Sequence, residues 1–370
     1  MDFTHTEAQQ DLEQLTRSIA EKLTTPERLK ELDSAEDRFD DKLWKALADA
    51  GVLAAALPES VGGGGFGILE QCSVLQQLGR PLSPVPYLSS IVLAAGALAE
   101  FGDEGQRELA RRAGAGEAIL TVALAEELNL DPAQPVTRAE RSGDGWSITG
   151  TKITVPAATL ADAILVPAAT SDGVAVFVVD PSAPGVTVTR QLTTDFSAES
   201  MVDLAGVSTT EVLGGVERGA EVVDWILARA AVGLTAQQLG TLERALELVA
   251  EYARERVQFD RPIGSFQAVA QRLADGFIDV KAVRSTLWQA AWRLSENLPA
   301  EEEIRTAKFW AADAGHRVSH TVIHVHGGVG LDRDHPVHRY FLAAKHNEFA
   351  LGSATEQLRR LGQSLADVPA

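Results

Sequence analysis

The sequence predicts an α+β protein with an N-terminal all-helical domain, a middle β-barrel or β-sandwich domain and a C-terminal four-helix bundle. Residues 1–117 contain capped, amphipathic segments typical of helices. Residues 118–215 contain short β-branched runs bounded by Pro, Gly and Asp, which are typical of strands. Residues 216–370 contain long stretches without proline, which pack as antiparallel helices when short loops join them. Domain boundaries are therefore expected at 117/118 and 215/216.

In the N-terminal part, Thr4 to Leu23 is amphipathic and begins with the cap signal Thr6-Glu7. A second helix is expected from Asp40 to a closing glycine, Gly51. The glycine-rich stretch 57–67 follows a helix rather than a strand and lacks a correctly spaced acidic partner for a ribose. It is therefore predicted to be a turn between helices and not a dinucleotide-binding loop.

The middle and C-terminal parts show strand and helix periodicities in turn. Strands are expected at 146–155, 163–166, 174–179 and 185–189. Long helices are expected at 221–257, 266–298 and 301–326. Their apolar positions are numerous enough to cover more than one face, which predicts burial both in the bundle and in an oligomer interface.

Composition excludes several classes of partner. With 33 basic and 52 acidic residues among 370, the net charge is −19, which argues against nucleic acid or an anionic membrane as a partner. No apolar run is long enough to cross a bilayer, and the polar N-terminus is not a signal peptide. The single cysteine, Cys72, fits a reducing cytosol, so a cytoplasmic location is expected.

Several motifs, taken together, resemble the acyl-CoA dehydrogenase family. Tyr252 to Gln267 matches the signature Y-x-x-E-R-x-x-F-G-x-P-I-x-x-F-Q at all but one fixed position, and Leu273-Ala274-Asp275 follows at the family spacing. The stretch from His324 to Gly330 resembles Q-x-x-G-G-x-G, and Leu57-Pro58-Glu59 with its glycines resembles the P-E-x-x-G-G loop. The matches run from about residue 40 to 355.

The resemblance implies the acyl-CoA dehydrogenase fold, a tetramer, FAD bound between subunits and an acyl-CoA thioester beside the flavin. Arg256 suits a pyrophosphate because its guanidinium is a planar fork of donors, Phe259 offers an aromatic face, and glycines let a backbone approach a ligand closely. In isolation, a helix-capping arginine and helix-breaking glycines would explain the same residues. The cofactor-binding residues that the resemblance implies are Arg256, Phe259, Gln267, His324, Gly327, Gly328, Ser353 and Thr355.

The departures from the family pattern cluster on the flavin site. The family's glycine after the signature Phe is Asp260, and the family's Gln is His324. Thr154 stands where a Trp normally lies against the flavin, and Pro156 stands where a Thr hydroxyl normally bonds it. The T-E-P loop is represented only by Ala125-Glu126-Glu127. These substitutions remove an aromatic ring and a hydroxyl that would contact the flavin, and proline has no N–H to donate. Whether this chain's own site holds FAD is therefore left open.

The position of the family's catalytic base is occupied by Leu351, which cannot accept a proton. Some family members carry the base on the first long bundle helix, and the corresponding residue here is Ala230. The fallback candidates are Glu348 and Asp224, although a solvated helix surface explains both more simply. The backbone N–H of Leu351 survives the substitution, so the chain could still orient a thioester carbonyl.

One competing pattern is His316, His320 and His324, spaced by four along a helix and followed by His326, which could bind Zn²⁺ on one face. No carboxylate completes the set, and an interface stripe explains it better, so no metal is predicted.

Three functions remain, in order of preference. The first is a base-lacking subunit of a hetero-oligomeric acyl-CoA dehydrogenase whose partner carries the Glu, resembling the subunits of actinobacterial enzymes that degrade steroid side chains. The second is a homotetrameric dehydrogenase with a relocated base. The third is a non-catalytic thioester-binding or assembly protein without flavin.

Overall fold

The computed structural model describes residues 5–129 and 131–366, so Thr4 of the first predicted helix lies outside the described residues. The chain forms two compact units. The first comprises the described residues of Met1–Arg28, Ile68–Ser83 and Ala231–Ala370, and the second comprises Leu29–Gly67 and Pro84–Ala230. The helix α8 runs from one unit into the other, and each unit is described by itself below.

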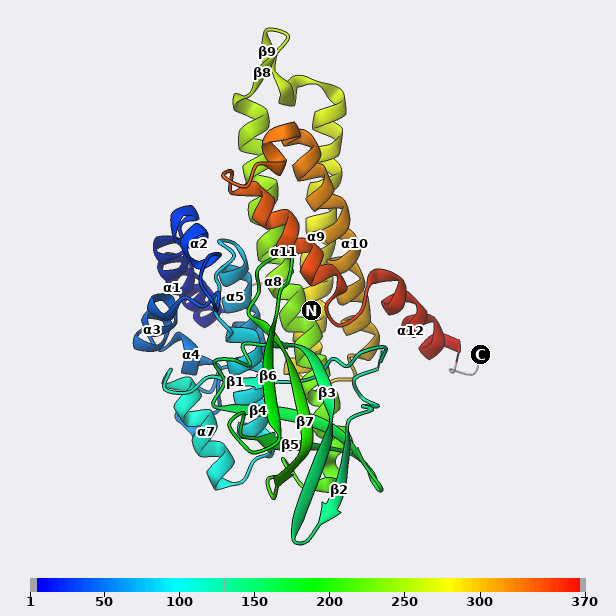
Figure 1. Cartoon of the computed structure of the whole chain (residues 1–370). Coiled ribbons are helices and arrows are strands. Elements are labelled where there is room, and N and C mark those ends of the chain that lie inside the picture. The colour runs from blue at the N-terminus through cyan, green and yellow to red at the C-terminus, as the bar shows by residue number, and fades with distance from the viewer. Residues whose placement is uncertain (1–4, 130, 367–370) are drawn as a thin grey trace. The chain divides into compact units, whose positions relative to one another are not determined.

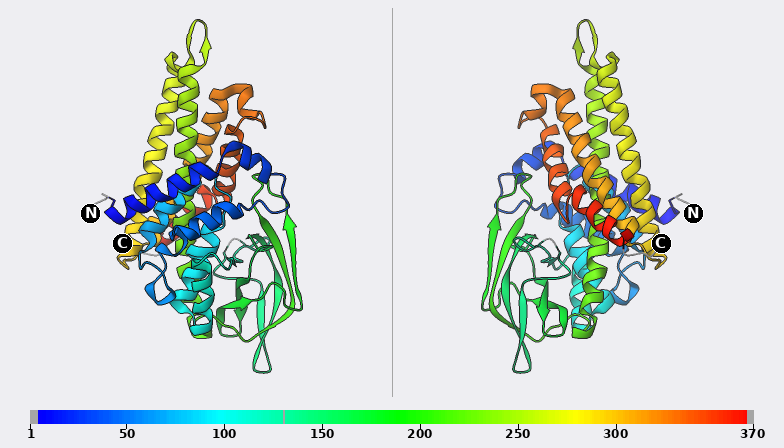
Figure 2. Two further views of the ribbon diagram at one scale, coloured as in Figure 1. Left: turned by 90° about the vertical axis from the view of Figure 1, so that its left-hand side faces the viewer. Right: turned by 90° about the vertical axis from the view of Figure 1, so that its right-hand side faces the viewer.

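The first unit is a helical bundle. Long helices of this unit run side by side, and the short β8–β9 hairpin stands at the end where α8 and α9 are joined (Figures 1 and 2). Its elements are α1 (Glu7–Leu23), α5 (Ile68–Gly79), most of α8 (Gly219–Glu255), β8 (Val257–Gln258), β9 (Arg261–Pro262), the 3₁₀ turn η4 (Ile263–Ser265), α9 (Gln267–Ser295), α10 (Glu301–His326), the 3₁₀ turn η5 (Gly327–Leu331), α11 (Val337–Phe349) and α12 (Ala354–Ala366).

Local chemistry explains where these helices begin and how closely they pack. Helix α1 begins with a capping box, in which Thr6 Oγ1 accepts from Gln9 N at 3.1 Å and Gln9 Oε1 accepts from Thr6 N at 2.9 Å. Helices α5 and α8 approach closely at a glycine, because a Cβ on Gly240 would stand 1.9 Å from the carbonyl oxygen of Gln76. A larger residue at Gly240 would therefore force the two helices apart.

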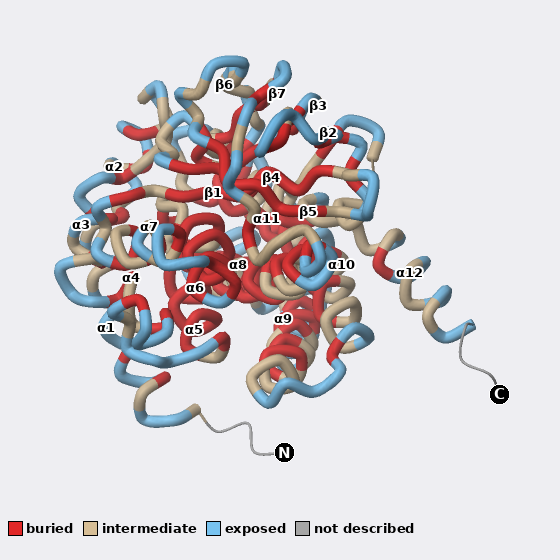
Figure 3. The backbone as a smooth tube through the Cα atoms, turned by 90° about the horizontal axis from the view of Figure 1, so that it is seen from below, coloured by how far each residue is buried: buried red, intermediate tan, exposed pale blue. Residues whose placement is uncertain are grey.

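Two parts of the bundle surface remain apolar and uncovered by the described chain. Phe277 and Ile278 on α9 are 55% and 63% exposed. On α12, Gln357 is the buried residue, and the helix is otherwise intermediate or exposed (Figure 3). The predicted use of a second apolar face in an oligomer interface stays a prediction.

The second unit combines short helices with a seven-stranded mixed sheet. The strand order is β1-β4-β2-β3-β7-β6, with β5 also paired to β4. The helical elements are α2 (Pro26–Leu32, mostly in this unit), α3 (Asp41–Asp49), α4 (Val52–Ala55), η1 (Glu59–Val61), the π-helical η2 (Tyr87–Ala95), α6 (Gly96–Phe101), α7 (Glu104–Gly114), η3 (Val216–Arg218) and the first turns of α8. The strands are β1 (Leu120–Val122), β2 (Arg138–Ser142), β3 (Gly145–Pro156), β4 (Ala163–Thr170), β5 (Gly173–Val179), β6 (Val186–Gln191) and β7 (Glu199–Thr209).

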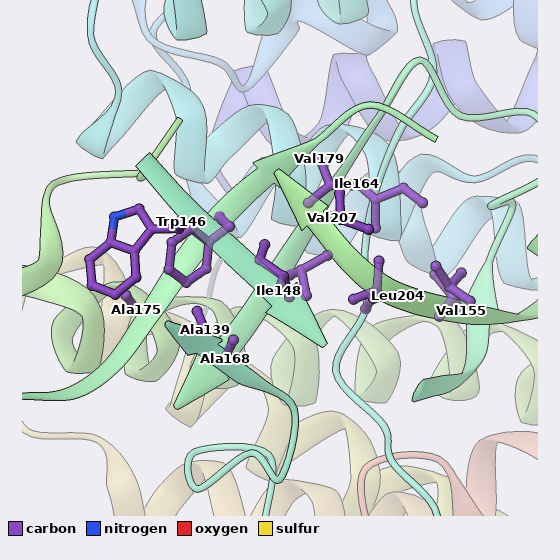
Figure 4. Packing of buried hydrophobic residues seen from close by; sticks show 14 of the residues in the cluster. Ala139, Trp146, Ile148, Val155, Ile164, Ala168, Ala175, Val179, Leu204 and Val207 are labelled. Atoms are coloured by element: carbon purple, nitrogen blue, oxygen red, sulfur yellow. The ribbon is translucent and has the colours of Figure 1, made fainter. Parts of the chain in front are cut away.

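The sheet encloses its own apolar core (Figure 4). Alternate residues of β3, such as Trp146 and Ile148, point into this core and meet side chains from β4, β5 and β7. The rings of Trp146 and Phe177 meet edge to face with centroids 5.4 Å apart. This core holds β3 in register, and β3 carries the residues at the predicted flavin position.

Candidate functional site

The turn that carries Leu351 has an unusual backbone. Helix α11 ends at Phe349, after which Leu351 has φ of 58° and Gly352 has φ of 96°. A left-handed conformation is unfavourable for leucine, so the surrounding structure must hold it. Within the part of the chain that the structure describes, the Leu351 N–H has no hydrogen-bond acceptor. It is therefore available to an oxygen atom of a ligand.

A buried lysine on α10 clamps this turn. Lys308 Nζ donates to the carbonyl oxygens of Asn347, Glu348 and Gly352 at 3.2, 3.2 and 3.0 Å. An ammonium has three donors, so these three carbonyls satisfy it completely. Burial lowers the pKa of Lys308 to about 8, while Glu348 and Glu356 oppose the shift. No sequence pattern points to this role, because a lysine in a helix normally indicates a solvated face.

Three amide side chains complete the support of the turn. Asn347 Nδ2 donates to Gln238 Oε1 at 2.9 Å, and Gln238 Nε2 in turn donates to the carbonyls of Ala311 and Ala344. Gln357 Nε2 on α12 donates to the carbonyl of Leu351 at 2.8 Å. Helices α8, α10, α11 and α12 thus all fix the backbone around Leu351, and none of these bonds uses its side chain.

The structure places Glu348, the nearer fallback base, in an ion-paired cluster. Its carboxylate lies 2.5 Å from Lys345 Nζ and 3.3 Å from His316 Nδ1. These ion pairs explain the position of the Glu348 carboxylate without a catalytic role. Its use as a relocated base stays a prediction.

The family's alternative base position, Ala230, and the fallback candidate Asp224 both lie on α8 in the other unit. Ala230 is buried, whereas Asp224 is exposed and lies six residues earlier on the same helix. Between them, the Arg229 guanidinium stacks on the Trp225 ring at 3.7 Å. Burial lowers the pKa of Arg229 to about 10, and Glu100 opposes the shift. No carboxylate occupies position 230 to replace the base missing at Leu351.

At the other end of the bundle lie six of the predicted cofactor residues, which we call the bundle-end patch. The guanidinium of Arg256, which belongs to this patch, is exposed and has no ion-pair partner among the described residues. Phe259 is 87% exposed. The patch comprises Arg256, Phe259, Gln267, His324, Gly327 and Gly328. Of the other two predicted cofactor residues, Ser353 is half-buried beside the Leu351 turn and Thr355 is exposed on α12.

The two glycines of the patch leave open space above their backbone. Gly327 has φ of 64° and ψ of −139°, a combination that residues with a Cβ rarely adopt. No atom of the described chain lies within 4 Å of where a Cβ would stand on Gly327 or Gly328. A ligand can therefore approach this backbone directly, as it does in phosphate-binding loops.

The substitution of Asp260 for the family glycine leaves the hairpin geometry intact. Phe259 and Asp260 are the two central residues of the β8–β9 turn, with φ of 52° and 62°. A two-residue hairpin turn of this kind requires positive φ at both positions, and aspartate tolerates it better than most residues.

We therefore expect Asp260→Gly to stabilise the protein slightly. Removing the Cβ at a left-handed position should add about 0.5–1 kcal/mol to the free energy of unfolding. Thermal unfolding of the variant measures the gain. Asp260→Val, which cannot relax at this position, should instead lower the unfolding temperature; equal unfolding temperatures for both variants would contradict the assignment.

On the β-domain side, the residues at the predicted flavin position do not offer what a flavin needs. Strand β3 has a register irregularity between Lys152 and Val155, where Thr154 takes φ of 47°. A β-branched residue in this conformation is strained. Its N–H donates to Gln191 Oε1 of β6 at 2.7 Å, so that donor is already used within the chain. Pro156 has no N–H to give.

A buried ion pair stands beside this irregularity. Lys152 Nζ lies 2.8 Å from Glu126 Oε1, with side-chain exposures of 0% and 1%. Glu126 also accepts from the N–H groups of Val136 and Thr137 and from Asn129 Nδ2. Burial alone would raise the pKa of Glu126, but the hydrogen bonds from Lys152 and Thr137 outweigh it and hold the pKa at about 2.

The depressed pKa of Glu126 predicts a specific acid sensitivity. The pair contributes stability above the carboxyl's ordinary pKa of 4.5, and this contribution is lost as the pH falls from 4.5 towards 2. Urea unfolding at pH 7 and pH 3 should show wild type losing about 2 kcal/mol more than Glu126→Gln between these pH values. Parallel losses in the two proteins would contradict it.

The two sets of residues, each taken by itself, fit FAD unequally. The bundle-end patch fits the phosphate-bearing part of a dinucleotide, because it combines a free guanidinium, an exposed ring and open glycine backbone. The β3 irregularity does not fit the ring system, because it lacks an aromatic side chain and its donors are used or missing.

The histidines of α10 do not form a metal centre in the described part of the chain, where no three or more His, Cys, Asp or Glu side chains gather in a way that could hold a metal ion. His316 and His320 lie close, with centroids 4.4 Å apart, while His324 is exposed. No helix among the described residues is long and apolar enough for a membrane span.

Comparison with known proteins matches nearly the whole chain. Models of the N-terminal, middle and C-terminal domains of acyl-CoA dehydrogenases match residues 6–112, 123–209 and 217–366. Acyl-CoA dehydrogenase FadE27 of Mycobacterium tuberculosis is 54% identical over 381 residues, covering 100% of both chains. A chain in the crystal structure of the ChsE4-ChsE5 complex from M. tuberculosis is 54% identical with a TM-score of 0.95, covering 100% of both chains. A chain of a variant of the Tcur3481-Tcur3483 steroid ACAD is 40% identical with a TM-score of 0.92, covering 98% of both chains.

Proposed function

Because this chain belongs to the acyl-CoA dehydrogenase family, we propose that it is a base-lacking subunit of a hetero-oligomeric, FAD-dependent acyl-CoA dehydrogenase. The observation that carries the proposal is the division of the site within one chain. The bundle-end patch keeps the groups that face a nucleotide, whereas the Leu351 turn and the β3 irregularity have lost the groups that would serve chemistry at the flavin ring.

The missing base decides which chain performs the reaction. The α,β-desaturation of a thioester removes the α-proton and transfers the β-hydride to the flavin, so a proton acceptor must lie beside the substrate. Leu351 and Ala230 occupy both family positions for that acceptor, and neither side chain has a lone pair. A positioned base typically accelerates such a step by about 10²–10⁴-fold.

The bundle-end patch gives this chain a role in the partner's site. We assign Arg256, Gly327 and Gly328 to the pyrophosphate of an FAD whose ring is held by the partner, with Phe259, Gln267 and His324 beside the nucleotide. The guanidinium would neutralise phosphate charge in a chain whose net charge is otherwise −19. Ser353 and Thr355 would complete the predicted cofactor contacts at the other end of the bundle.

The relatives suggest the kind of partner and substrate. One similar structure is that of a ChsE4-ChsE5 complex, and another is that of a Tcur3481-Tcur3483 steroid ACAD variant. The partner proposed here is a second acyl-CoA dehydrogenase chain that carries Glu at the position of Leu351. The proposed substrate is the CoA thioester of a steroid side chain.

The test compares the chain alone with the chain co-expressed with that partner. The chain alone should be colourless and should not turn over an acyl-CoA, whereas the complex should bind one FAD per pair of chains and its flavin absorbance should bleach on adding the thioester. Removing the partner's Glu should abolish bleaching, while Glu348→Gln and Asp224→Asn in this chain should leave the rate unchanged. One FAD per chain in a homo-oligomer that bleaches without a partner would refute the proposal.

A further inference from the structure

An aromatic pair lies at the root of the bundle-end patch. The rings of Tyr252 on α8 and His326 on α10 are stacked, with centroids 4.4 Å apart and planes inclined by 24°. The Tyr252 hydroxyl lies 3.5 Å from the carbonyl oxygen of His326, and the His326 side chain is buried. Nδ1 of His326 donates to the carbonyl of Val322 at 2.8 Å, which fixes the orientation of the ring.

Each residue of the pair is connected through the backbone to one part of the patch: Tyr252 to Arg256, and His326 to Gly327. Arg256 lies one helical turn after Tyr252, and its N–H donates to the Tyr252 carbonyl at 2.8 Å. Gly327 follows His326 and begins the open glycine backbone. The stack is therefore a direct contact between the end of α8, which carries Arg256, and the end of α10, which precedes the open glycine backbone.

We propose that Tyr252 and His326 form a positioning pair that sets the separation between Arg256 and Gly327–Gly328, and so controls how tightly this end of the bundle holds the phosphates of a dinucleotide. The inference rests on the proposed function, in which these residues face the FAD of the complex. Neither ring needs to touch the cofactor, because each acts through the backbone that it anchors.

The pair also makes the patch sensitive to acid. Burial lowers the pKa of His326, the hydrogen bond to Val322 opposes this, and His335, 5.5 Å away between ring centroids, lowers it further. The ring is therefore neutral at neutral pH. As the pH falls below the ordinary histidine pKa of 6.5, protonation of the buried His326 places a desolvated positive charge beneath Gly327. Tyr252 and His335 are the titratable groups that the structure places against His326.

The experiment measures FAD release from the purified two-chain complex by flavin fluorescence at pH 7.5 and pH 5.5. His326→Phe keeps a stacked ring and removes the titrating group, whereas His326→Ala removes the ring. Aromatic pairing of this kind corresponds to about 3–10-fold in an equilibrium constant, so His326→Ala should weaken FAD binding by that factor at pH 7.5. His326→Phe should bind as wild type at pH 7.5 and should lose most of the acid weakening that wild type shows.

Controls separate this inference from the proposed function. Arg256→Gln should weaken FAD binding at both pH values. If Arg256→Gln leaves FAD affinity unchanged, the proposed function fails. If Arg256→Gln weakens binding but His326→Ala matches wild type, or if His326→Phe retains the full acid sensitivity, only the positioning pair is overturned. Should His326→Ala fail to assemble, the comparison of His326→Phe with wild type still decides.

Discussion

Replacing Lys152 with methionine is expected to destabilise the second unit more than any other single change considered for that unit. The ammonium and the Glu126 carboxylate are almost completely buried, and the carboxylate organises the 126–137 loop through three further hydrogen bonds. Removing one member of a buried pair leaves an uncompensated charge, which typically costs about 3–5 kcal/mol. Urea denaturation at pH 7 should show this loss in the free energy of unfolding.

Matched variants test whether the loss comes from the stranded charge. Lys45→Met changes an exposed lysine in the same unit, with 78% side-chain exposure, and should alter stability by less than about 0.5 kcal/mol. Adding Glu126→Gln to Lys152→Met should restore part of the loss, because a neutral amide is less costly to bury than a carboxylate. A double variant that is less stable than Lys152→Met would contradict this account.

The second large effect is expected from Lys308→Met in the bundle. The substitution keeps an apolar stem of similar length but leaves the carbonyls of Asn347, Glu348 and Gly352 without their common donor. Buried polar groups that lose their partner cost about 1–3 kcal/mol each when water cannot reach them, so a total of about 2–4 kcal/mol is expected.

A local measurement distinguishes the clamp from general destabilisation. Amide hydrogen exchange of the segment 349–353 should accelerate in Lys308→Met under conditions where α5 and the middle of α8 stay protected. Lys281→Met, which alters an exposed lysine on α9, should leave both stability and exchange unchanged. Uniform acceleration across the whole bundle would argue against a specific hold on the turn.

The predicted fold class is confirmed by the three family models and by the structural neighbours, and the predicted family is confirmed with it. Periodicity located the long helices well. Helix α10 has the predicted bounds, and α8 starts and ends two residues earlier than predicted. It missed strands β1, β2 and β7. Strand β2 is mostly exposed and reads R-A-E-R-S, so it lacks the apolar alternation on which strand prediction depends.

The part of the candidate site that lies in contiguous sequence motifs was predictable. Arg256, Gly327 and Gly328 lie in contiguous motifs, so the sequence was sufficient to single them out. Lys308 and Gln191 act across distances of roughly 40 residues along the chain, on Gly352 and Thr154, and only the folded backbone brings them together. The domain boundaries and the assigned roles of the site residues stay predictions.

The way the Leu351 turn is held has a consequence for how inactive subunits arise. The bonds that Lys308 and Gln357 donate to this backbone all end on main-chain carbonyls, and none of the bonds that support the turn uses the side chain at 351. Mutational drift can therefore exchange the residue at this one position without disturbing folding. A duplicated gene could therefore lose the catalytic base at position 351 in one substitution and still encode a folded assembly partner. The reverse substitution would place a carboxylate on a backbone that already has the required conformation.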